Sequence, residues 1–132
     1  PWSSSLSPPP LLRSPGSLPS PSDYRVCGGH LTDDYGTIST HEGPHTECVW
    51  TLQVDPNYKI LVSMTSLNLT CGKEYVELLD GPPGSKSLGK FCNGLSILSR
   101  GSTSTMTVKY SRDSDHPTSP YEIIFLRDSQ SK

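Results

Sequence analysis

Four cysteines and one glycosylation motif are the residues of this sequence with the most defined chemistry. The cysteines are Cys27, Cys48, Cys71 and Cys92, and Asn68-Leu69-Thr70 is an acceptor sequence for an N-linked glycan. An even number of cysteines in a small chain with such an acceptor is typical of an oxidising compartment, where thiols pair as disulfides. A zinc site is the alternative, but the cysteines are widely spaced and form no C-x-x-C pair. We therefore expect a secreted, extracellular protein with two disulfides, for which three pairings are possible.

Basic residues along the chain could bind anionic groups on a glycan. Sulfate oxygens are bound best by clustered cations, and Arg is favoured because its guanidinium makes forked contacts. We select Lys73, Lys109 and Arg112 as the glycan-binding residues. Lys109 faces solvent if its strand neighbour Val108 is in the core, and Arg112 follows at the start of a loop. The competing interpretation is that these charges, together with those of Lys86, Lys90 and Arg100, are scattered and serve only solubility.

The histidines form no recognisable catalytic or metal-binding motif. His41 and His45 are four residues apart, but they lie in a loop with Gly43-Pro44 rather than on a helix. The sequence also lacks a G-x-S-x-G nucleophile motif and a Gly-rich phosphate loop. Catalysis needs a nucleophile and a base that a third group holds in place, and the sequence suggests no such set. We therefore expect a binding protein that is not an enzyme and that has no cofactor.

Composition divides the 132 residues into a leading segment and one domain. Residues 1–22 contain seven of the thirteen prolines and many serines, a composition that cannot bury a core. We expect residues 1–26 to be a disordered leader or linker, residues 27–128 to form the domain, and residues 129–132 to be a C-terminal tail. The formal net charge of −2 argues against nucleic acid as a partner.

Alternation of apolar and polar residues predicts several strands, and no segment shows a sustained helical period. Residues 121–127 are apolar on both faces, so we expect this strand to lie centrally, whereas residues 96–100 should pair only weakly. Many short strands with turns between them predict an all-β sandwich or barrel. The residues expected to face the core are Trp50, Leu52, Val54, Ile60, Val62, Met64, Val76, Leu78, Met106, Val108 and Tyr110.

The order of the cysteine motifs resembles a known extracellular family. The matching runs are Cys27-Gly28-Gly29, Cys48-Val49-Trp50, and Cys71-x-x-Glu74-Tyr75-Val76-Glu77 leading to Asp80-Gly81. They are similar to those of the CUB domain, which is an antiparallel, jelly-roll-like β-sandwich of two sheets. The resemblance covers nearly all of residues 27–127. It implies two disulfides, Cys27 with Cys48 and Cys71 with Cys92.

Longer runs are similar to one branch of this family, the spermadhesins. They are Ile38-Ser39-Thr40-x-Glu42-Gly43-Pro44, the run from Leu67 to Gly84, and Lys109-Tyr110-Ser111-Arg112. This resemblance implies a secreted, single-domain protein of seminal plasma that coats sperm and acts in fertilization. The implied partners are glycoproteins of the zona pellucida, sulfated glycans such as heparin, phospholipid at the sperm surface, and homo- or hetero-oligomers with related CUB proteins. The alternative is a generic extracellular CUB interaction module from a larger multidomain protein, with the proline-rich segment as its linker.

The same resemblance raises the question of calcium. Many CUB domains bind Ca²⁺ through a Glu before the third cysteine, an Asp three positions after it, where this chain has a Glu, and a later Asp. Glu74 and Asp113 match the last two positions, but residues 66–70 contain no carboxylate for the first. Since Ca²⁺ takes six to eight oxygen ligands, we expect no calcium cofactor, and we expect Glu74 and Asp113 to be ordinary surface carboxylates. A glycan on Asn68 should lie in a loop at one end of the sandwich, where it could cover a binding or oligomer surface.

Overall fold

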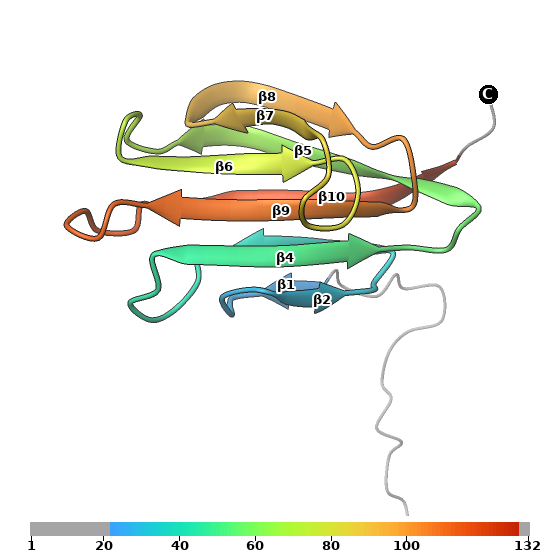
Figure 1. Ribbon diagram of the computed structural model, residues 1–132, viewed down its shortest axis with the longest axis horizontal. Coiled ribbons are helices and arrows are strands. Elements are labelled where there is room, and N and C mark those ends of the chain that lie inside the picture. The colour runs from blue at the N-terminus through green and yellow to red at the C-terminus, as the bar shows by residue number, and fades with distance from the viewer. Residues whose placement is uncertain (1–21, 130–132) are drawn as a thin grey trace, which may run out of the picture.

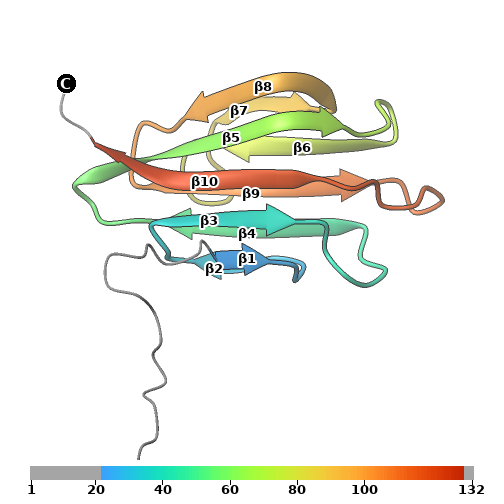
Figure 2. The same ribbon diagram turned by 180° about the vertical axis from the view of Figure 1, so that it is seen from behind.

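The computed structural model describes residues 22–129, which form two packed five-stranded sheets (Figures 1 and 2). Sheet A has the strand order β1-β3-β10-β5-β8, and sheet B has the order β2-β4-β9-β6-β7. The strands are β1 (Ser22–Tyr24), β2 (Gly29–Leu31), β3 (Tyr35–Ser39), β4 (Glu47–Gln53), β5 (Tyr58–Asn68), β6 (Glu74–Leu79), β7 (Ser87–Phe91), β8 (Asn93–Arg100), β9 (Thr105–Arg112) and β10 (Glu122–Ser129). This architecture confirms the predicted all-β, two-sheet sandwich. The described residues include no helix long and apolar enough to span a membrane, and most of the expected leader lies outside them.

Strand β10 occupies the centre of sheet A, as its two apolar faces predicted. It pairs antiparallel with β3 on one side and with β5 on the other. Phe125 points into the core and is fully buried, whereas Ile124 points outward and is only partly buried. Phe125 lies opposite Gly36 of β3, where a Cβ atom would come within 2.8 Å of the phenyl ring. A glycine at position 36 therefore makes room for the largest apolar side chain of the central strand.

The core lies between the inner faces of the two sheets. All eleven residues expected to face it are buried, so this prediction is confirmed. Trp50 of β4 is fully buried, and its indole N–H donates to the carbonyl of Val26 at 3.1 Å. This bond satisfies the one polar atom of a side chain that otherwise contributes only apolar area.

Three strands differ from the prediction. Strands β1 and β2 were not anticipated, and they pair in parallel with β3 and β4 at one edge of each sheet. At three residues each, they are too short to show a period in the sequence. The expectation of weak pairing over residues 96–100 was wrong, because β8 pairs with β5 along seven residue pairs. Apolar residues stand on both faces of β8, with Leu95 and Leu98 exposed and Ile97 packed against the core, so the sequence of this strand shows no clean alternation.

Two disulfides link segments that are 21 residues apart. Cys27 joins Cys48, which attaches the segment before β2 to β4, and Cys71 joins Cys92, which attaches the β5–β6 turn to the end of β7. The pairing implied by the family resemblance is confirmed. Each bridge closes a short loop and stabilises the fold by roughly 3 kcal/mol through the lost entropy of the unfolded chain.

The two faces of β10 should contribute unequally to stability. Phe125→Ala leaves a cavity in the sealed core and should lower the free energy of unfolding by about 3–5 kcal/mol. Ile124→Ala, one position away on the outward face, should lower it by only about 1 kcal/mol. Urea unfolding of both variants tests this, and equal losses would contradict the assignment of the two faces.

Candidate functional site

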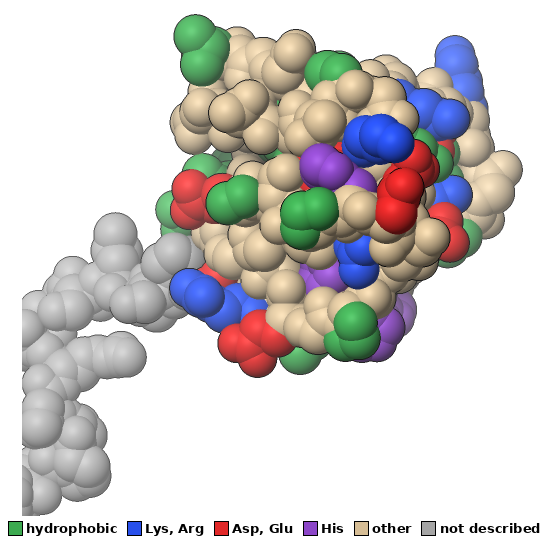
Figure 3. All heavy atoms as spheres, turned by 90° about the vertical axis from the view of Figure 1, so that its left-hand side faces the viewer, with side chains coloured by type: hydrophobic (Ala, Val, Ile, Leu, Met, Phe, Trp, Pro, Cys, Tyr) green, Lys and Arg blue, Asp and Glu red, His purple; other side chains and the backbone are tan. Residues whose placement is uncertain are grey.

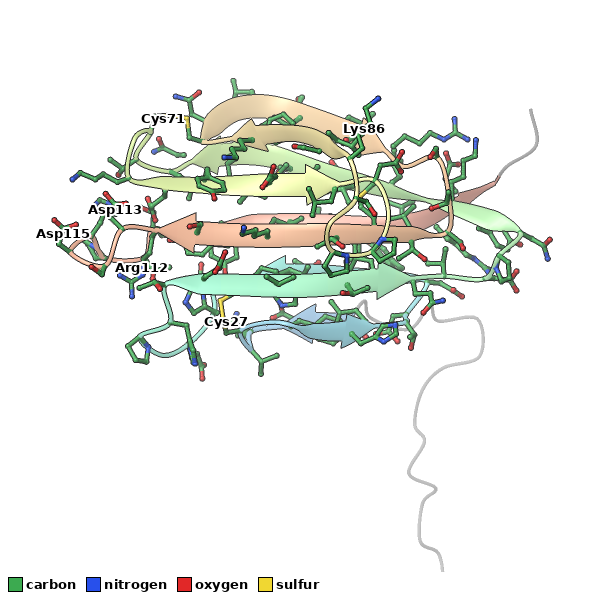
Figure 4. The ribbon with its side chains drawn as sticks, viewed as in Figure 1. Cys27, Cys71, Lys86, Arg112, Asp113 and Asp115 are labelled. Carbon is green, nitrogen blue, oxygen red and sulfur yellow. A yellow bond between two sulfur atoms is a disulfide. The ribbon has the colours of Figure 1, made fainter. Side chains whose placement is uncertain are left out.

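Polar and aromatic side chains converge in a groove of about 230 Å³ on the outer face of sheet B. The groove lies where β6, β7 and β9 meet the β5–β6 turn, toward the end of the sandwich at the left of Figure 1. Asp113 and Cys71 are labelled at this end in Figure 4. The side chains that matter for its chemistry are those of Lys73, Tyr75, Lys90, Ser111 and Asp113. They supply ammonium groups, hydroxyls, a carboxylate and one aromatic ring around one small volume.

Lys73 and Asp113 form one wall of the groove. The ammonium of Lys73 lies 3.7 Å from the Asp113 carboxylate, and both side chains are about half exposed. The backbone N–H of Asp113 also donates to the carbonyl of Lys73 at 2.8 Å. The two residues come from different loops, so this backbone bond fixes the position of the ion pair.

Tyr75 and Lys90 form the opposite side of the groove. The ammonium of Lys90 lies over the ring of Tyr75, 4.7 Å from its centroid. Directly across from Tyr75 on β9 is Ser111, whose small side chain also lines the groove. The sequence placed Tyr75 on the face opposite Val76 but gave it no role, and the register with Ser111 that makes it part of a site could not be read from the sequence.

Lys109, selected as a glycan-binding residue, lies on the same outer face but away from the groove. Its ammonium contacts the Glu47 carboxylate at 3.0 Å, and the hydrogen bond that Lys109 donates to Glu47 raises the pKa of Lys109. Glu77 lies directly opposite Lys109 on β6. Carboxylates therefore surround this cation and offset its charge.

Arg112, the third selected residue, donates hydrogen bonds from its guanidinium to backbone carbonyls of two loops. Its Nη2 donates to the carbonyl of Pro44 at 2.8 Å, and its Nη1 donates to the carbonyl of His116 at 2.6 Å. The first acceptor lies in the β3–β4 loop and the second in the β9–β10 loop, so Arg112 joins these loops at the end of the sandwich (Figure 4). Figure 3 views this end directly and shows basic and acidic side chains interspersed across it.

Glu74 is a buried carboxylate, so the expectation that it lies on the surface was wrong. It is 2% exposed and accepts hydrogen bonds from Thr70 N–H at 2.9 Å and Tyr110 O–H at 2.5 Å. Ser119 donates both its N–H, at 2.8 Å, and its hydroxyl, at 2.6 Å. Burial raises the pKa of Glu74, but these hydrogen bonds outweigh burial and lower it to about 2.

These surroundings do not fit a calcium ion. Both oxygens of Glu74 already accept hydrogen bonds from N–H and O–H donors, whereas calcium requires further oxygen ligands. Asp113 contacts Lys73 instead of turning toward Glu74. Within residues 22–129, no three or more His, Cys, Asp or Glu side chains gather to hold a metal.

The histidines make structural contacts, and His41 Nε2 lies 3.1 Å from the backbone carbonyl of His45. His41 is buried and hydrogen-bonds the hydroxyl of Tyr121 at 2.8 Å, and burial raises the pKa of this tyrosine to about 12. His116 lies 3.3 Å from Glu74, and His30 contacts Gln53 at the sheet edge. Each of these histidines has a structural contact, and none of the contacts described joins it to a serine or cysteine nucleophile.

Asn68 is the last residue of β5 and is exposed opposite Asn93 of β8. We expected it in a loop, but it ends a strand of sheet A. The groove lies on sheet B, so the two surfaces belong to different layers. Glycosylation of Asn68 stays a prediction.

Comparison with known proteins gives one family and several relatives. The CUB domain model matches residues 27–125. The major seminal plasma glycoprotein PSP-I of Sus scrofa is 80% identical over 108 residues, which are 82% of this chain and 80% of that protein. The carbohydrate-binding protein AWN of Equus caballus is 47% identical over 106 residues, 80% of each chain, and spermadhesin Z13 of Bos taurus is 38% identical over 105 residues, 80% of this chain and 90% of that protein. The CUB1-EGF-CUB2 domain structure of human MASP-1/3 shares the fold at 16% identity and a TM-score of 0.63, over 76% of this chain and 42% of that chain.

Acid should destabilise the protein through Glu74. The pKa of this carboxyl is about 2 in the fold and near 4.5 in the unfolded chain, so its stabilisation is complete above pH 4.5 and is lost as the pH falls toward 2. The loss amounts to about 3 kcal/mol. Glu74→Gln should lack this part of the pH dependence, which urea unfolding of both proteins at a series of pH values measures. If the variant loses stability as steeply as the wild type over this range, another carboxylate carries the acid sensitivity.

Proposed function

Since this chain belongs to the CUB-domain family and, within it, to the spermadhesins, we propose that it binds carbohydrate in the groove on sheet B. The observation that carries the proposal is the convergence of an aromatic ring, ammonium groups, a hydroxyl and a carboxylate in one small groove. The relatives AWN of Equus caballus and AQN-3 of Sus scrofa are named carbohydrate-binding proteins. The protein is a secreted, non-enzymatic binding protein. We assign it to seminal plasma because its relatives PSP-I and PSP-II are both named major seminal plasma glycoproteins.

Tyr75 supplies the apolar contact that a sugar ring needs. An aromatic face carries partial negative charge and attracts weakly positive C–H groups, and it offers a flat surface of large area. Around it, Lys73 and Lys90 can donate hydrogen bonds, Asp113 can accept them, and Ser111 can do both. A sugar presents an apolar face and a rim of hydroxyls, and this set of groups complements both.

The expected partners at a finer level are glycoproteins of the zona pellucida and the sperm surface, with sulfated glycans and phospholipid as further predictions. Lys73 and Lys109 are each paired with a carboxylate. A sulfated polysaccharide such as heparin gains most from cations that lack such partners. The groove therefore supports a glycoprotein glycan more strongly than it supports a long polyanion.

Loss of the Tyr75 ring should weaken binding to glycoprotein glycans. Tyr75→Ala removes the stacking surface, and the affinity should fall roughly tenfold. The matched control is Val49→Ala, which removes an exposed apolar side chain from the same outer face of sheet B, outside the groove. Binding to immobilised glycoprotein measures both variants, and an equal effect of the two substitutions would remove the groove as the site.

A second function, self-association, is favoured by the outer face of sheet A. Tyr35 and Leu98 are 51% and 65% exposed, and together with Leu61, Ile124 and Leu126 they line a hollow of about 640 Å³. Figure 2 shows the strands of sheet A on the side turned toward the viewer. We propose that a second copy of the chain covers this face, in line with the expected oligomers of CUB proteins. Exposed apolar patches on secreted proteins commonly mark interfaces.

Charges at the border of this face favour a second copy as the occupant. Asp34 pairs with Arg127 at 3.5 Å, and Arg100 pairs with Asp128 at 3.1 Å. The border therefore carries both signs of charge, and a two-fold copy can place each sign against its opposite. A partner with only one sign of charge would be matched less well.

A charge within the apolar face should reduce association. Leu98→Lys places an ammonium where the second copy would pack, so the apparent mass in solution should shift toward that of the monomer. Leu95→Lys is the matched control, because Leu95 is on the same strand and more exposed but does not line the hollow. Light scattering after size exclusion measures the mass, and a wild-type monomer at all concentrations would rule out self-association.

A further inference from the structure

We infer that Asp113 determines which glycans the groove accepts, by rejecting sulfated and other anionic sugars in favour of uncharged ones. The inference rests on the proposed carbohydrate-binding function and adds to it a selectivity and the residue responsible. It begins with the ion pair in the groove wall, where the Asp113 carboxylate lies 3.7 Å from the ammonium of Lys73. Asp113 thus partly neutralises Lys73, which without this carboxylate would be available to bind an anionic ligand.

The charges of the surrounding sheet face are balanced. The lysines are Lys73, Lys90 and Lys109, and the facing carboxylates are Asp113, Glu77 and Glu47. Glu77 lies across from Lys90 on one side and across from Lys109 on the other. An anion approaching this face therefore meets as many negative as positive groups.

Hydrogen-bonding capacity gives the same selectivity. Sulfate oxygens only accept hydrogen bonds, and an ionised carboxylate also only accepts, so the two repel without any compensating bond. A sugar hydroxyl both donates and accepts. Two neighbouring hydroxyls could therefore accept from Lys73 and donate to Asp113, using both members of the pair.

Backbone contacts hold Asp113 in this position. Its N–H donates to the Lys73 carbonyl at 2.8 Å, and its carbonyl accepts from the His116 N–H at 3.1 Å. Neither contact uses the carboxylate, which is paired with Lys73, is about half exposed and can therefore also contact a ligand. A change of the side chain alone should therefore leave the loop in place.

Asp113→Asn tests the inference, with Asp115→Asn as its matched control. Both residues lie in the β9–β10 loop and are labelled in Figure 4, and both substitutions remove one negative charge. Asp115 is exposed and does not line the groove. The probe is a glycan panel in which each uncharged backbone is printed beside its sulfated form, and heparin retention over a salt gradient is the second readout.

Wild-type protein and Asp115→Asn should both prefer the unsulfated glycans. Asp113→Asn should raise the ratio of sulfated to unsulfated glycan binding by roughly three- to tenfold. The slope of log heparin affinity against log salt concentration should increase in magnitude by about one, because one more counterion is released. Adding Lys73→Gln to Asp113→Asn should abolish the increase in sulfated-glycan binding, since Lys73 is the cation that loses its carboxylate partner in Asp113→Asn. Unchanged thermal melting would exclude loss of the loop structure as the cause.

Two outcomes would overturn the inference while leaving carbohydrate binding intact. One is a wild-type preference for sulfated glycans, and the other is an equal shift for the two Asp→Asn variants, which would reflect net charge alone. Failure of the wild type to bind either form of any glycan would instead remove the proposed function, and the inference with it.

Discussion

A buried carboxylate joins the two loops that form the wall of the groove. Glu74 accepts hydrogen bonds from Thr70 in the β5–β6 turn and from Ser119 in the β9–β10 loop. An ionised carboxylate is costly to bury unless donors surround it, and here the donors of both loops and of Tyr110 do so. Lys73 and Asp113 lie in these same loops. Their spacing is therefore set by the fold before a ligand arrives, which lowers the entropy lost on binding.

Charged residues at this end of the sandwich divide into those that build it and those that face outward. Arg112 and Glu74 direct their polar atoms at backbone and buried hydroxyl groups. Lys73 and Asp113 remain about half exposed beside them. The charged groups of Arg112 and Glu74 are therefore less available to a ligand than those of Lys73 and Asp113.

The sequence predicted the layers of this fold well, because period-two alternation is a local signal. The residues alone left three disulfide pairings open, and the pairing that the structure has was implied by the family resemblance. Trp50 and Phe125 face the core as their alternation requires. The site was predicted less well, because it depends on which residues lie opposite one another across strands. Nothing in the neighbours of Tyr75 along the chain reveals that Ser111 lies beside it.

Burial was also difficult to read from single residues. Glu74 has the residue type of a surface group, and only the arrival of Ser119 and Tyr110 from distant segments makes its burial favourable. Arg112 was selected because guanidinium groups bind anions well, but Pro44 and His116 supply carbonyls that use its donors. Tyr110, Ser119 and Pro44 lie 36 or more residues from the charged group that they contact. His116 is close to Arg112 in the sequence, but it lies in a loop whose path the sequence does not define.

The three-residue strands β1 and β2 have a consequence for how molecules of this fold could join edge to edge. They cover β3 and β4 at one side of the sandwich, and each is too short to template a long ladder with a foreign strand. At the other side, β7 and the eight-residue β8 end the two sheets. An extended peptide could therefore add a strand to the sheets beside β7 or β8, whereas β1 and β2 offer edges too short for stable backbone pairing.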